Sequence, residues 1–174
     1  MSAGAVLRAS VIVFVAAMLQ TVIVSSLVVG GGTPDLLLVV VVSLGLIRGS
    51  VAGAVFGFVG GVIVDLVTLD TLGITSLVLT LAGFWAGRYV ETTGRDRLAP
   101  LVAVGTITLV AGLFGFVLHY MLGEEVVARH ALVTALIPAL ALNILLALPV
   151  HALVKGTVGE GTHAKPSHEV EVVV

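Results

Sequence analysis

GSVAGAVFGFVGGVIVDL, residues 49–66, is an apolar stretch in which glycine returns at every fourth position. These glycines are Gly49, Gly53, Gly57 and Gly61, and the next step in the row is Asp65. In a water-soluble helix each interior glycine costs about 1 kcal/mol relative to alanine. In a bilayer, helices associate through van der Waals contact, and small residues let their backbones approach closely. The stretch therefore predicts a membrane-spanning helix that packs tightly along its glycine row.

The composition supports a membrane location for the whole chain. Of its 174 residues, 59% are hydrophobic and 10% are charged, and the mean hydropathy is +1.24. Soluble domains are about 45–50% apolar and about 25% charged. The net charge of −2 gives no reason to expect a nucleic-acid partner, and the absence of cysteine excludes disulfides and thiol chemistry. We therefore expect an all-α integral membrane protein.

Six apolar segments approach the length of about 20 helical residues that a hydrocarbon core of about 30 Å requires. They lie near residues 8–29, 34–48, 50–68, 72–90, 98–121 and 131–154. The second is the weakest, because only 14 residues run from Pro34 to Ile47. If it does not cross, the chain has five spans and a re-entrant piece. We predict a compact bundle of about six transmembrane helices.

The basic residues favour six spans and set the expected orientation. With the N-terminus inside, only Arg129 falls on the outer side. The cytoplasmic side then holds Arg8, Arg48, Arg88, Arg95, Arg97, Lys155 and Lys165. This distribution agrees with the positive-inside rule and predicts both termini in the cytoplasm. The chain then divides into a six-helix transmembrane domain, residues 1–155, and a cytoplasmic tail, residues 156–174, for which we expect no stable structure.

Two roles are open for the glycine row. The first is tight internal packing of the bundle, which small residues favour. The second is a groove that receives the transmembrane helix of a partner. The two roles are compatible, because a bundle this small has more grooves than it can close internally. The candidate docking residues are Gly49, Gly53, Gly57, Gly61 and Asp65.

Polar side chains within the spans are the other candidates, since a charged group at mid-depth costs roughly 2.5–3.5 kcal/mol. Thr33 is a candidate N-cap for the second helix, and the acid at Asp35 would meet the positive end of the helix dipole. Gln20 and Asn143 are expected to form hydrogen bonds within the membrane, and those of Asn143 to hold neighbouring helices at about 1 kcal/mol. In the predicted orientation a polar cluster forms at the outer mouth of the bundle. Its members are Asp35, Asp65, Asp70 and His119.

The sequence contains no set of residues typical of an enzyme. Catalysis needs an acid and a base, or a nucleophile and a base, that converge in a cavity. The chain has one well-placed acid and scattered histidines. We therefore expect neither catalysis nor a bound cofactor or metal.

Residues 33–88 contain an ordered series of features. A Pro-Asp pair opens the second helix, an arginine precedes a turn, the third helix is glycine-rich with a late aspartate, the fourth helix starts with Leu-Gly, and an aromatic residue lies among glycines at its end. The residues are Pro34 and Asp35, Arg48, the row Gly53, Gly57, Gly61 and Asp65, Leu72 and Gly73, and Trp85 with Gly83 and Gly87. In the order and spacing of these features, residues 33–88 resemble the rod shape-determining protein MreD family.

The resemblance implies a non-enzymatic component of the bacterial rod (elongation) complex in the cytoplasmic (inner) membrane. Such proteins associate with the bitopic protein MreC, help regulate the glycan polymerase RodA and its transpeptidase partner, and connect to the MreB cytoskeleton. A homo-oligomer is left open. The family is also distantly similar to the substrate-binding subunits of energy-coupling-factor transporters. The alternative function is therefore a small-solute binder, with Asp35, Asp65 and His119 lining an outward pocket.

Overall fold

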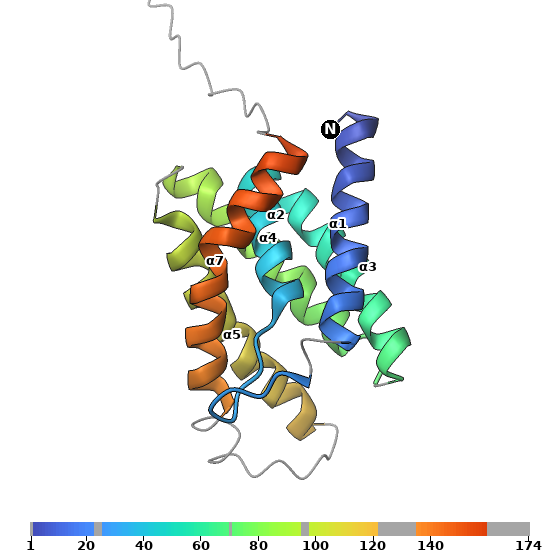
Figure 1. Cartoon of the computed structure of the whole chain (residues 1–174), viewed down its shortest axis with the longest axis vertical. Coiled ribbons are helices and arrows are strands. Elements are labelled where there is room, and N and C mark those ends of the chain that lie inside the picture. Colours follow the sequence, from blue (N-terminus) through green and yellow to red (C-terminus); the bar gives the residue numbers. More distant parts are fainter. Residues whose placement is uncertain (1, 23–25, 70, 95–97, 122–134, 160–174) are drawn as a thin grey trace, which may run out of the picture.

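The computed structural model of the chain describes residues 2–22, 26–69, 71–94, 98–121 and 135–159. These residues form six helices (Figure 1). The helices are α1 (Ala3–Val22), α2 (Leu36–Arg48), α3 (Ser50–Thr68), α4 (Ile74–Thr93), α5 (Ala99–Met121) and α7 (Ile137–Val158). The prediction of an all-helical protein with six helices is thus confirmed.

Four of the helices in the described ranges are long and apolar enough to cross a membrane: α1, α3, α5 and α7. α2 has only 13 residues, which is about 20 Å of helix. α4 has 20 residues and carries Arg88 and Glu91 in its last two turns. The cytoplasmic location of both termini stays a prediction. So does the division near residue 155, because α7 runs to Val158 and residues 160–174 lie outside the described part.

α2 forms the centre of the bundle. Every residue from 37 to 47 is buried, and the helix contacts α1, α3, α4, α5 and α7. A helix that is hydrophobic on all sides is expected to be enclosed by protein, and the sequence LLLVVVVSLGLI has that character. The surrounding helices expose large apolar side chains outward, for example Phe14 on α1 and Leu145 on α7. The short second segment is therefore the core around which the other helices pack.

The first helix ends earlier than predicted. α1 does not continue to residue 29, and the chain turns at Gly30 and Gly31, whose φ angles are +62° and +92°. These left-handed conformations suit glycine and form a turn after the helix has ended. Gly32 then packs on the first turn of α7, where a Cβ atom would lie 2.6 Å from the backbone nitrogen of Ala139. The chain returns from this turn to α2 without helix, as the blue segment of Figure 1 shows.

Candidate functional site

The glycine row of α3 packs directly against α4. A Cβ atom at Gly53 would lie 2.2 Å from the carbonyl oxygen of Gly83, and one at Gly57 would lie 2.2 Å from that of Leu79. A Cβ atom at Gly61 would lie 2.3 Å from the backbone of α4. A side chain does not fit at these separations. Each of the three glycines is therefore needed for the two backbones to be in contact.

α2 also packs against this contact between α3 and α4. A Cβ atom at Gly45 would lie 2.5 Å from the carbonyl oxygen of Gly83, and one at Gly83 would lie 2.1 Å from that of Gly53. A Cβ atom at Gly87 would lie 2.1 Å from the backbone nitrogen of Ser50. We call this shared contact of α2, α3 and α4 the glycine seam. It consists of Gly45, Gly53, Gly57, Gly61, Gly83 and Gly87.

This geometry matches the internal-packing role of the glycine row. A partner helix could reach Gly53, Gly57 and Gly61 only by displacing α4, so docking at these residues stays a prediction. Gly49 has a different position: it lies in the turn between α2 and α3, with φ of +92°, and its N–H donates to the carbonyl oxygen of Gly45 at 2.8 Å. Gly49 is therefore a turn residue between the two helices.

Two carboxylates join the ends of α3 and α4. Oδ2 of Asp65, near the end of α3, accepts hydrogen bonds from the N–H of Gly73 (2.9 Å) and from the N–H (3.3 Å) and hydroxyl (2.9 Å) of Ser76. Oε1 of Glu91, near the end of α4, accepts from the N–H (2.8 Å) and hydroxyl (2.9 Å) of Ser50. Each helix thus supplies an acid to the start of the other, where free N–H groups and the helix dipole favour negative charge.

The start of α2 is also bound by side chains from its neighbours. Asp35 is the N-cap, and its Oδ1 accepts from the N–H of Leu38 at 2.9 Å. The N–H of Leu36 donates to Oε1 of Gln20 at 2.8 Å, and the N–H of Asp35 donates to Oδ1 of Asn143 at 2.7 Å. Helix starts inside a membrane protein need such acceptors because water is scarce there.

The side-chain amides of Gln20 and Asn143 each accept one hydrogen bond through oxygen and donate another through nitrogen. Nδ2 of Asn143 donates to Oγ1 of Thr108 at 3.2 Å. Nε2 of Gln20 donates to a backbone carbonyl of the segment before α2, at 3.2 Å. The two amides thus connect α1, α2, α5 and α7. The prediction of Thr33 as N-cap was wrong, because Asp35 is the N-cap and its carboxylate accepts from the N–H of Leu38.

The predicted outer polar cluster is described only in part. Asp35 binds the start of α2 and Asp65 binds the start of α4, and their hydrogen-bond partners do not overlap. Asp70 lies outside the described residues, as does the side chain of His119 in α5. Within the described part of the chain, no three metal-ligating side chains come together. The cluster as a whole stays a prediction, and its two described carboxylates are engaged by helix starts.

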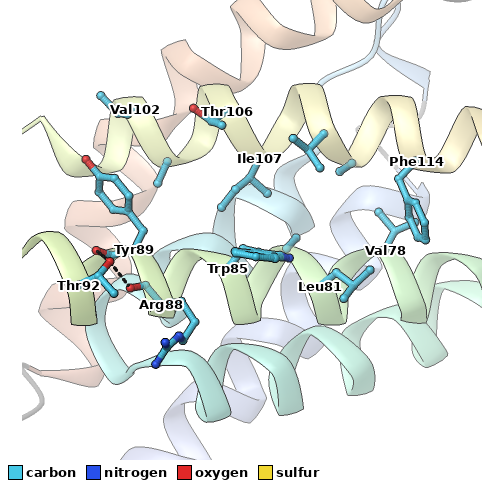
Figure 2. A pocket seen from close by; sticks show the side chains of 14 residues that line it. Val78, Leu81, Trp85, Arg88, Tyr89, Thr92, Val102, Thr106, Ile107 and Phe114 are labelled. Atoms are coloured by element: carbon cyan, nitrogen blue, oxygen red, sulfur yellow. Dashed lines mark hydrogen bonds between the residues drawn. The ribbon is translucent and has the colours of Figure 1, made fainter.

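An open apolar groove lies between α4 and α5, with a volume of about 770 Å³. Leu81 and Trp85 of α4 face Ile107 and Phe114 of α5 across it (Figure 2). This groove was not predicted from the sequence, although one signal was present. Trp85 is two residues from both glycines that α4 contributes to the seam, and residues two apart lie on opposite sides of a helix. The glycine seam and the groove are thus on opposite faces of α4.

One comparison with known proteins gives a match. The family model described as rod shape-determining protein MreD matches residues 3–156, which include helices α1 to α5 and all of α7 except its last two residues. No curated protein and no solved structure matches the chain.

Proposed function

This chain belongs to the MreD family of rod shape-determining proteins, and on that premise we propose that it is a scaffold that binds the transmembrane helix of a partner. As a family member it has a role in rod-shape determination, lies in the inner membrane and is not an enzyme. The partner we propose is MreC. Through MreC the protein would act on RodA, its transpeptidase partner and the MreB cytoskeleton.

The hydrogen bonds of the buried polar side chains support a scaffold function. Asp35, Asp65 and Asn143 all form hydrogen bonds that hold one helix of the chain to another or cap a helix start. The glycine seam is closed by three helices of the same chain. Because Oδ1 of Asp35 and Oδ2 of Asp65 already hold helix starts, a solute could bind these acids only through their second carboxylate oxygens. The alternative function, a transporter subunit, therefore has less support than a scaffold.

The groove between α4 and α5 is the docking surface we propose. On α4 it runs from Val78 to Thr92, which corresponds to about 21 Å of helix, more than half of a hydrocarbon core of about 30 Å. Ala82 and Ala103 in its lining allow a helix to approach closely, and Trp85 offers a large contact area. These features fit one apolar helix from a membrane partner, and this open groove is the observation that carries the proposal.

The glycine row remains the alternative docking surface. To reach Gly49, Gly53, Gly57, Gly61 and Asp65, a partner would have to separate α4 from α3. That step would open the seam and break the hydrogen bonds of Asp65. Docking in the groove leaves both in place.

Cysteine crosslinking can test the groove, because the chain has no cysteine of its own. Single substitutions Thr106→Cys and Leu81→Cys place a thiol in the groove. Phe14→Cys on α1 and Leu145→Cys on α7 are matched controls, since both positions are exposed on other faces. Each variant is co-expressed with MreC that carries single cysteines along its span, and the membranes are oxidised.

The proposal predicts disulfide-linked MreC for the two groove variants, with a period of three to four residues along the MreC span because a helix is expected to lie in the groove. Crosslinks of equal yield from Phe14→Cys and Leu145→Cys would overturn it. So would the absence of crosslinks from the groove while the two proteins still co-purify.

A further inference from the structure

Positively charged side chains from three helices meet at the C-terminal end of α7. Nη1 of Arg8 in α1 donates to the carbonyl oxygen of Thr157 at 3.4 Å, and Nη2 of Arg48, at the end of α2, donates to the carbonyl oxygen of Val158. Lys155 lies in the last turn of α7. Figure 1 shows the start of α1 and the end of α7 at the same end of the bundle. We call Arg8, Arg48 and Lys155 the cationic end.

Among the described residues, Arg8 and Arg48 carry more positive charge than the end of α7 neutralises. The C-terminus of a helix carries about −0.5 elementary charge, which offsets part of one guanidinium. Neither Arg8 nor Arg48 forms an ion pair with a carboxylate of the described residues. Arg88, by contrast, lies 3.3 Å from the carboxylate of Glu91. The guanidinium groups of Arg8 and Arg48 therefore keep N–H donors for an external anion.

Apolar side chains flank the cationic end. Leu7, next to Arg8, and Leu153, two residues before Lys155, are both exposed. In an inner-membrane protein such surfaces contact acyl chains, while long basic side chains near helix ends reach the headgroup layer. A ligand that fits both features has a negative group beside a hydrocarbon chain. A soluble acidic segment matches the charge but leaves the apolar flank uncovered.

We propose that the cationic end binds the phosphate group of an anionic phospholipid. The exposed guanidinium of Arg8 and the ammonium of Lys155 would contact the headgroup, since guanidinium groups form strong paired hydrogen bonds with phosphate oxygens. Arg48, half-buried at the end of α2, would add positive charge behind Arg8 and Lys155. The lipid would then hold α1, α2 and α7 together at this end. The site does not depend on which side of the membrane it faces.

Native mass spectrometry in detergent can test the site with added phosphatidylglycerol, and with phosphatidylcholine as the zwitterionic reference. The variants are Arg8→Gln and the double variant Arg8→Gln with Lys155→Gln. Arg88→Gln is the matched control, because it removes a cation that is already paired with an acid. Arg48 is left unchanged, since its half-buried guanidinium holds the end of α7 and its loss could prevent folding.

The expected result is preferential retention of phosphatidylglycerol by the wild type. Its affinity should fall about fivefold for each cation removed from the cationic end, and Arg88→Gln should bind like the wild type. Equal retention of both lipids by the wild type would overturn the proposal. An equal loss in Arg88→Gln and Arg8→Gln would do so too, because it would indicate a nonspecific effect of charge. Neither result bears on crosslinking to MreC.

Discussion

Replacement of Gly57 by alanine is the sharpest perturbation of the glycine seam. The new Cβ atom would lie 2.2 Å from the carbonyl oxygen of Leu79 and has to retreat to about 3.4 Å for ordinary contact. That oxygen belongs to the backbone of α4, so α3 and α4 must separate by about 1 Å at their tightest point. Overpacking of this kind costs about 1–3 kcal/mol or more, while the higher helix propensity of alanine returns at most about 1 kcal/mol. We expect a net loss of about 1–2 kcal/mol.

The assay is reversible unfolding in mixed micelles, and Gly115→Ala in α5 is the control. A Cβ atom at Gly115 has no neighbour within 4 Å, so the control should be neutral or stabilised by up to about 1 kcal/mol. The two variants make the same chemical change within a membrane helix. Equal stability of Gly57→Ala and Gly115→Ala would refute the conclusion that the seam is closed by α4.

The other predictions concern single polar or aromatic side chains. Asp65→Asn should lower the free energy of unfolding by about 1–3 kcal/mol, because this side chain is 1% exposed and accepts three hydrogen bonds at a helix start. Glu91→Gln should cost less, since its side chain is 31% exposed; equal losses in thermal melts would argue against the role of burial. Asn143→Leu should cost about 1–3 kcal/mol, because the N–H of Asp35 loses its acceptor, and an unchanged melting curve would exclude this. Trp85→Ala should change stability by less than about 0.5 kcal/mol and reduce co-purification with MreC severalfold; a parallel loss of stability would point to a structural role.

The sequence predicted the helices well because apolar length and glycine spacing are local properties. It also indicated that α2 is unusual, since 14 residues are too few to span a bilayer alone. The end of α1 was misplaced because valines continue up to Gly30 and keep the segment apolar after the helix has stopped. Apolar composition does not distinguish a helix from a non-helical segment such as residues 27–29, whose side chains are exposed.

The partners of each residue could not be predicted, because they depend on which helices become neighbours. The row from Gly53 to Gly61 predicted that another helix packs closely on α3. That this helix is α4 depends on the antiparallel pairing of α3 and α4. The hydrogen bonds from Ser50 to Glu91 join residues 41 positions apart and have no local signature. The groove beside Trp85 likewise exists only once α5 has packed alongside α4.

The most direct test of the account is a structure of this protein in complex with MreC in a lipid nanodisc. We expect one additional helix in the groove between α4 and α5, beside Trp85, with the glycine seam still closed. A partner helix seated on Gly53 and Gly57, with α4 moved away from α3, would contradict it.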